Sequence, residues 1–122
     1  MTYCTTAPSL AALEKRVHVT DPSLLPPQMM VEYDVPDDLP MRMMAISDLP
    51  VGWTVRETIT QNIGDEWLDG SSEVLLFVPS VIMPLANAPE RNVLINHRQA
   101  ASSRIKIVAA TPFTLDPRLF QP

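Results

Sequence analysis

The chain has 122 residues, of which 46% are hydrophobic and 19% are charged. This composition is typical of one globular domain and excludes a disordered chain. The formal net charge of -5 and the sequence pI near 4.8 exclude a bulk electrostatic attraction to nucleic acid or to an anionic membrane. The single cysteine, Cys4, excludes an internal disulfide and a zinc site built from several cysteines.

Two further features indicate the compartment. No apolar stretch reaches the ~20 residues that a membrane-spanning helix needs. The first residues lack the basic and apolar regions of a signal peptide. We therefore expect a cytoplasmic protein.

The 13 prolines favour short elements and many chain reversals over a helical bundle. Helical spacing of Leu10, Leu13 and Val17 after the start signals Pro8 and Ser9 predicts a helix over 9–18. The helix follows so closely on the first residue that we expect no strand before it. Further elements are predicted in this order: a strand over 29–35, a weaker strand over 41–46, a helix from the ambiguous segment 53–62 on to Leu68, a turn at 69–72, a central strand over 74–84, a short strand over 92–96, a final strand over 105–109 and an apolar tail over 111–120.

Strands outnumber helices in this order and do not alternate with them, so the fold class is α+β in a single domain over 1–122. Within the segment 64–68, Trp67 and Leu68 are predicted to face the core and Asp65 and Glu66 the solvent. The run 74–84 is apolar without alternation, which predicts a strand buried on both faces.

One hydroxyl, Ser80, interrupts this apolar run directly after Pro79. A buried hydroxyl without a hydrogen bond costs about 1–3 kcal/mol, and proline removes a backbone donor at the same point. We therefore expect Ser80 to be paired with the backbone or to lie at the floor of a cleft, and this is the first place to search for a functional site.

Several kinds of site find no support in the sequence. The two histidines, His18 and His97, belong to no metal-ligand spacing, and no serine lies in a G-x-S-x-G motif. The three glycines are too far apart for a phosphate-binding loop. The polar residues that remain as candidates to converge on one site are Tyr3, Glu14, Ser80, Asn92 and Asn96.

Six blocks follow one another along the chain: Tyr3 with SLAALE at 9–14, DLP at 48–50 with Trp53, GDEWL at 64–68, VPS at 78–80, NVLIN at 92–96 and PFTLDPRL at 112–119. Their order resembles the RES domain, a family that contains the toxins of RES–Xre toxin–antitoxin modules. The resemblance implies an α+β fold similar to that of ADP-ribosyltransferases. It also implies an enzyme that consumes NAD⁺ by cleaving the nicotinamide–ribose bond, with water or phosphate as the acceptor, and a cytoplasmic Xre-type antitoxin that covers the active site.

The family is named for an arginine, a glutamate and a serine. The resemblance places Glu14 on the glutamate, Ser80 on the serine and Tyr3 on an active-site tyrosine that would stack on the ring of NAD⁺; we add Asn96 as a fourth NAD⁺-binding residue. We expect no metal.

The family's arginine lies before the tyrosine, in a segment that has no counterpart ahead of Tyr3. We therefore expect a RES domain without its first few dozen residues, with exposed apolar surface beside the 9–18 helix. Two alternatives remain: a catalytically inactive RES remnant that only binds the antitoxin, and an unrelated α+β interaction domain.

Overall fold

The computed structural model describes residues 1–122 and shows one α+β domain with two helices. In chain order the helices and strands are β1 (Thr2–Thr5), α1 (Pro8–Val17), β2 (Gln28–Asp34), β3 (Met41–Met43), α2 (Glu57–Gly70), β4 (Leu75–Val78), β5 (Asn92–Ile95) and β6 (Lys106–Phe113). Short 3₁₀ turns lie between them and near the C-terminus. Neither helix is long and apolar enough to cross a membrane.

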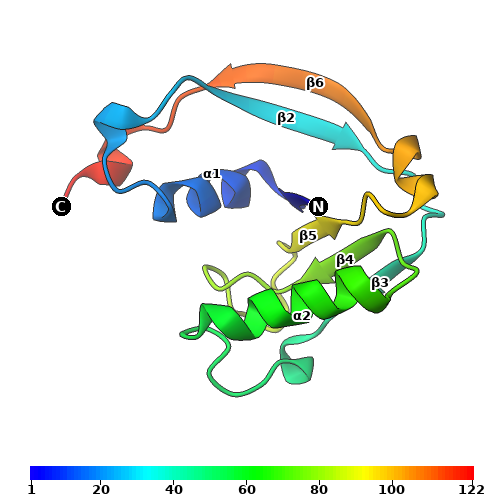
Figure 1. The fold of residues 1–122 in the computed structure, drawn as a ribbon. Helices are drawn as coiled ribbons and strands as arrows, with labels where there is room; N and C mark the ends of the chain where they lie inside the picture. The colour runs from blue at the N-terminus through cyan, green and yellow to red at the C-terminus, as the bar shows by residue number, and fades with distance from the viewer.

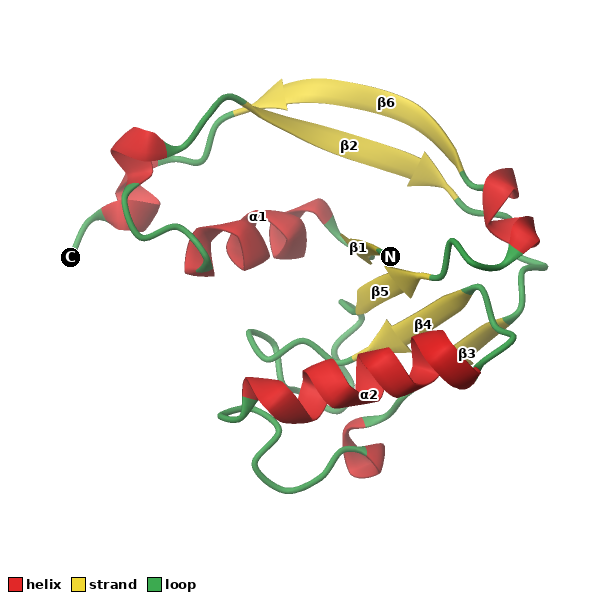
Figure 2. Cartoon of the chain, in the orientation of Figure 1, coloured by secondary structure: helices red, strands yellow, loops and turns green.

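The strands form two separate sheets (Figures 1 and 2). A four-stranded sheet has the order β1-β5-β4-β3, in which only the β3–β4 pair is parallel. The strands β2 and β6 form an antiparallel two-stranded ribbon that arches over α1 in the view of Figure 1. The helix α2 runs along the other side of the molecule, beside β3 and β4.

The core lies on both faces of the central strands β4 and β5. On one face Leu75 and Ile95 belong to a cluster with Leu39. On the other face Leu76 belongs to a cluster with Trp67 of α2, and Asp65 and Glu66 of the same helix are exposed. The predictions of a central strand buried on both faces and of an inward Trp67 are therefore confirmed.

The expectation that no strand precedes the first helix is wrong. Residues Thr2–Thr5 form β1, which pairs antiparallel with β5. Four residues are too few to show a periodicity, and what makes them a strand is a partner far along the chain.

Other predicted bounds also change. The central strand ends at Val78, since Pro79 supplies no backbone donor and the chain continues as a loop. The weak strand predicted over 41–46 is confined to Met41–Met43, and the last strand extends to Phe113 because β2 pairs with it along its length. Between Pro50 and Glu57 the chain makes a turn at Gly52, whose φ of 87° favours glycine, before α2 begins.

Apolar surface beside the first helix was expected, and Val17 at the end of α1 is exposed. The ribbon carries further exposed apolar side chains, namely Met29, Val31, Ile107 and Val108. The ribbon is therefore less well packed than the four-stranded sheet, whose central side chains are buried.

Truncating Leu76 to alanine should destabilise the domain by about 2–5 kcal/mol, because this side chain is completely buried between the sheet and α2. The free energy of unfolding, measured by urea denaturation, checks this. Val51→Ala is the control: this valine is 100% exposed, and its loss should change the same free energy by less than about 0.5 kcal/mol. Equal effects of the two substitutions would contradict the assigned core.

Candidate active site

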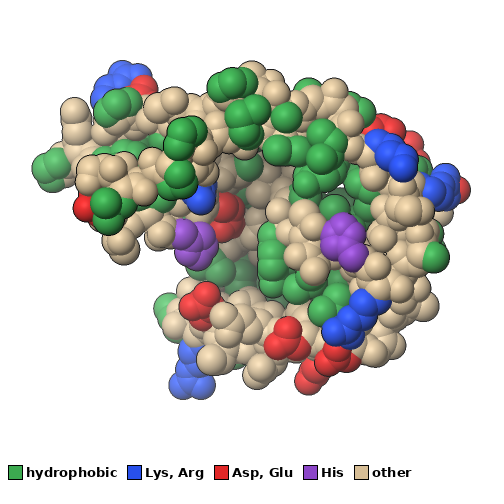
Figure 3. All heavy atoms as spheres, turned by 45° about the horizontal axis from the view of Figure 1, so that its top comes forward, with side chains coloured by type: hydrophobic (Ala, Val, Ile, Leu, Met, Phe, Trp, Pro, Cys, Tyr) green, Lys and Arg blue, Asp and Glu red, His purple; other side chains and the backbone are tan.

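A cleft of about 850 Å³ lies between α1 and α2 and is lined by 20 residues. Its walls come from β1, α1, the turn before α2, α2 itself and the ends of β4 and β5. In the space-filling view of Figure 3 the molecule is hollowed between its upper and lower parts, and acidic side chains lie in and below the hollow. The predicted residues Tyr3 and Glu14 both line this cleft.

Glu14 projects from α1 into the cleft, and two side chains hold its carboxylate. The Ser80 hydroxyl donates a hydrogen bond to Oε1 of Glu14 at 2.8 Å, and Nδ2 of Asn92 donates to the same oxygen at 3.0 Å. These partners lie 66 and 78 positions from Glu14 in the sequence. The fold thus unites the predicted carboxylate and the predicted hydroxyl.

The Ser80 hydroxyl is buried and fully paired. The backbone N–H of Ile82 donates to its oxygen at 3.1 Å, so the hydroxyl proton is left to point at Glu14. An amide N–H can only donate, which fixes the direction of this short chain of hydrogen bonds. The pairing offsets the cost of burying a hydroxyl in an apolar strand end. Ser80 therefore does not line the cleft itself; it holds the carboxylate of Glu14, which does.

The sheet register brings Asn92 to the same place. Asn92 is the first residue of β5 and lies opposite Val78, the last residue of β4. Ser80 follows Val78 by two residues, so the end of β4 and the start of β5 present a hydroxyl and an amide side by side. Both side chains donate hydrogen bonds to Oε1 of Glu14 on α1.

Tyr3 lies on β1 opposite Leu94 of β5 and is 72% exposed at the wall of the cleft. Its ring is therefore accessible to a ligand. The neighbouring Cys4 is half-buried, and this burial raises the pKa of its thiol above the ordinary value, which disfavours the thiolate needed for a nucleophile. No three His, Cys, Asp or Glu side chains form a group that could hold a metal ion.

Asn96, the fourth predicted residue, lies apart from this arrangement. Its side chain is completely buried and does not line the cleft. Its Oδ1 accepts a hydrogen bond from the backbone N–H of Arg98, and its Nδ2 has no partner. The asparagine that reaches the cleft is Asn92, at the other end of the NVLIN block. The sequence alone could not show which of Asn92 and Asn96 reaches the cleft, because residues four positions apart in the predicted strand 92–96 point to the same side.

Several other residues line the cleft that were not among the predicted site residues. Trp53 enters it from the turn that Gly52 permits, and His18 from the C-cap of α1. On α2 the acidic residues Glu57 and Asp65 also line it. Asp65 was predicted to be a solvent-facing carboxylate, and it is; the exposed face of α2 that carries it is also a wall of the cleft.

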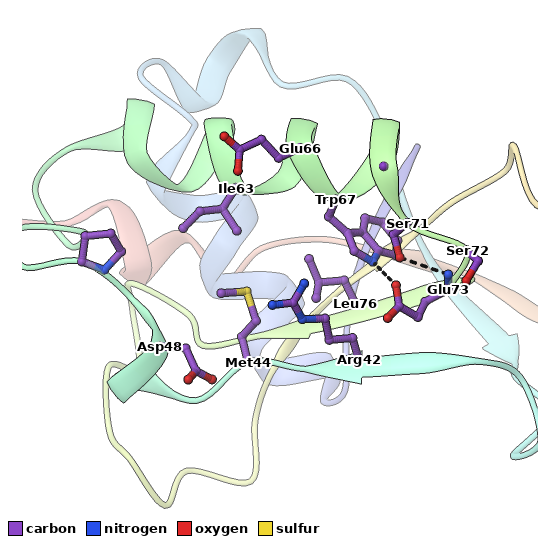
Figure 4. A pocket seen from close by; sticks show the side chains of 12 residues that line it. Arg42, Met44, Asp48, Ile63, Glu66, Trp67, Ser71, Ser72, Glu73 and Leu76 are labelled. Carbon is purple, nitrogen blue, oxygen red and sulfur yellow. Dashed lines mark hydrogen bonds between the residues drawn. The ribbon is translucent and has the colours of Figure 1, made fainter.

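A second pocket, of about 610 Å³, lies between β3 and α2 (Figure 4). There Nε1 of Trp67 donates to Oε2 of Glu73 at 3.3 Å, and Arg42 lies across from this pair. None of the predicted site residues lines it. The cleft between the two helices is therefore the candidate active site.

Comparison with known proteins identifies relatives and a family for this chain. Two bacterial relatives are each named Toxin Res: one from Pseudomonas putida is 41% identical over 71 residues, and one from Yersinia enterocolitica is 38% identical over 61 residues. These matches cover 57% and 49% of this chain and 44% and 38% of the relatives, so the chain spans less than half the length of the curated relatives it matches. The model of the RES domain matches residues 1–116. The chain belongs to the RES domain family.

Proposed function

We propose that the protein is the toxin of a type II toxin–antitoxin system and degrades NAD⁺ by cleaving the nicotinamide–ribose bond. The observation that carries the proposal is the anchored carboxylate of Glu14, with Ser80 and Asn92 on one oxygen and the cleft in front of it. Family membership and the relatives named Toxin Res support the toxin role. An ADP-ribosyltransferase-like fold is part of the same proposal and rests on the family resemblance.

The geometry suits a reaction through an oxocarbenium-like state. When the nicotinamide–ribose bond breaks, its electron pair goes to the pyridinium nitrogen, nicotinamide leaves neutral, and positive charge develops on the ribose. A carboxylate held in place stabilises this charge without having to reorient. Oε1 of Glu14 already accepts two hydrogen bonds, which leaves Oε2 for the ribose.

The acceptor then adds to the ribose carbon. Water gives ADP-ribose and a proton, and phosphate gives the corresponding ribosyl phosphate. Tyr3, exposed at the cleft wall, is positioned to stack on the nicotinamide ring. Asn92 lines the cleft, and we assign it the role of orienting Glu14, to which its amide donates a hydrogen bond.

A toxin requires a neutralising partner. We propose a cytoplasmic Xre-type antitoxin that covers the cleft, so that the two proteins form a hetero-oligomer. The names of the two relatives imply such a partner in general, and the Xre type rests on the resemblance of the six sequence blocks.

The second candidate is an inactive RES remnant that only binds the antitoxin. One observation favours it: the cleft has no Lys or Arg among its lining residues to hold a pyrophosphate. A charge-assisted hydrogen bond of that kind contributes about 1.5–3 kcal/mol to binding. Release of nicotinamide by the purified chain distinguishes the two candidates.

Single substitutions at Glu14 and Ser80 test the proposed reaction. Glu14→Gln should lower kcat/KM for nicotinamide release from NAD⁺ by at least about 100-fold, because it removes the charge that stabilises the transition state. Ser80→Ala should lower it by about tenfold or more, because Glu14 loses one of its two donors. Liquid chromatography of released nicotinamide measures both.

Matched controls carry the same chemical changes outside the cleft. Glu66→Gln alters an exposed carboxylate on α2, and Ser103→Ala an exposed hydroxyl near β6; both should leave kcat/KM within about twofold of wild type. No nicotinamide release by the wild-type chain at any phosphate concentration would overturn the enzymatic proposal and favour the remnant.

Asn92→Ala should lower kcat by about tenfold and leave KM for NAD⁺ little changed, because its amide orients Glu14. Asn87→Ala, in the exposed loop after β4, is the control and should be neutral. Wild-type kcat in the Asn92 variant would show that Ser80 alone positions the carboxylate.

In cells, induced expression of the wild-type chain should lower NAD⁺ content and arrest bacterial growth. Glu14→Gln should abolish both effects, since the damage depends on the reaction. Colony counts and enzymatic NAD⁺ assays are the measurements, with immunoblots to show equal protein levels. Equal growth arrest by the wild-type chain and the Glu14→Gln variant would show that toxicity does not depend on the cleft.

A further inference from the structure

Two hydrogen-bond donors of the candidate active site are engaged by no other group of the protein. His18 lines the cleft, and its ring takes part in no hydrogen bond or ion pair, whereas the ring of the other histidine, His97, is hydrogen-bonded. Trp53 also lines the cleft, and its Nε1, which can only donate, has no partner. The Nε1 of the other tryptophan, Trp67, is paired. The cleft therefore offers two free N–H groups to a ligand.

The burial of Trp53 does not come from the apolar core. This side chain is 7% exposed, yet it belongs to neither of the two apolar clusters. A buried tryptophan usually pairs its N–H. The one fully enclosed polar side-chain atom without a partner is Nδ2 of Asn96, so the N–H of Trp53 is not enclosed. Because Trp53 lines the cleft, an acceptor bound there can pair with it.

His18 lies on the same side of α1 as Glu14. It is the C-cap of this helix and keeps a helical backbone conformation, with φ -95° and ψ -2°. Residues four positions apart on a helix share a face, with Cβ atoms about 5–6 Å apart. In NAD⁺ the ribose that the proposed reaction places at Glu14 is joined to the diphosphate through one methylene group. The spacing of Glu14 and His18 therefore suits a ribose at the first and a phosphate at the second.

Charge determines the side of the cleft on which a phosphate can lie. Glu57 and Asp65 on α2 repel it, and no Lys or Arg lines the cleft. His18 on the α1 side is the one lining side chain able to become a cation near neutral pH, and its ring donates an N–H in either charge state. In Figure 1 the end of α1, which His18 caps, and the start of α2, which Trp53 precedes, lie at the same end of the molecule.

We propose that His18 and Trp53 bind the diphosphate of the dinucleotide, His18 through a charge-assisted hydrogen bond and Trp53 through its indole N–H. The inference rests on the proposed function, because it assigns the phosphate-binding residues of the same cleft. Both residues hold the substrate, and bond cleavage depends on Glu14. The assignment supplies the phosphate contacts that a cleft without Lys or Arg otherwise lacks.

The test compares NAD⁺ with nicotinamide riboside, which has the same scissile bond and no phosphate, as substrates of the whole chain. His18→Ala should raise KM for NAD⁺ at least about tenfold with little change in kcat, and should lower the ratio of kcat/KM for NAD⁺ to that for the riboside by the same factor. Trp53→Phe keeps an aromatic ring, removes the N–H and should lower this ratio at least about threefold. His18→Arg should restore the ratio to within about twofold of wild type, because a guanidinium also binds phosphate.

The other histidine and the other tryptophan provide matched controls outside the cleft. His97→Ala and Trp67→Phe make the same chemical changes and should leave the ratio within about twofold of wild type. Thermal unfolding checks that all variants are folded. Titration calorimetry with ADP-ribose, which carries the diphosphate and no scissile bond, measures binding without turnover; His18→Ala should weaken it at least about tenfold.

The outcomes separate this inference from the proposed function. Nicotinamide release from NAD⁺ with an unchanged substrate ratio in His18→Ala overturns the phosphate-binding role and leaves the proposed function standing. An equal change of the ratio in His97→Ala also overturns it. Release of nicotinamide from neither substrate defeats the proposed function, and ADP-ribose then decides: weaker binding by His18→Ala than by the wild-type chain supports the diphosphate site, and equal binding or none by both overturns it.

Discussion

The carboxylate of Glu14 connects the first helix to the sheet. Oε1 receives Ser80 from beyond β4 and Asn92 from the start of β5, so one oxygen joins three parts of the chain. A half-buried carboxylate loses hydration, and two donors on one oxygen compensate for that loss. The other oxygen remains for the cleft. The arrangement therefore stabilises the fold and orients the site at once.

This connection depends on the register of the central strands. Val78 lies opposite Asn92, and Ser80 follows two residues later. A slip of one residue between β4 and β5 would turn every side chain of the moving strand to the other face, and Leu76 and Leu94 would leave the cluster under α2. The apolar residues of the core thus fix where the hydroxyl and the amide meet Glu14.

Local patterns in the sequence predict part of this structure. The apolar run around Leu75 and Leu76 shows burial on both faces, and the position of Ser80 within it points to a paired hydroxyl; both are confirmed. The strand at Thr2–Thr5 is invisible to such reasoning, because its stability comes from pairing with β5. The choice between Asn92 and Asn96 likewise depends on which end of β5 faces α1, a property of tertiary structure alone.

The same limit explains why the acidic character of the cleft was not predicted. Asp65 and Glu66 are neighbours on α2 and both exposed, yet only Asp65 lines the cleft, because the side chains of adjacent helical residues point about 100° apart. From the sequence alone, Asp65 and Glu66 are both expected to face the solvent, and nothing distinguishes them. Their different surroundings arise from the placement of α1 opposite α2.

That placement is held at both ends of α1. At its start, the short link from β1 ties the helix to the sheet, and at its end Arg16 binds the C-terminal segment. Nε of Arg16 donates to the carbonyl oxygen of Leu119 at 2.8 Å, and its guanidinium lies 4.3 Å from the centre of the Phe120 ring. Glu14 lies half a turn before Arg16 on the same helix. The C-terminal segment therefore contributes to the site without touching the cleft, since it limits how far α1 can move away from Ser80.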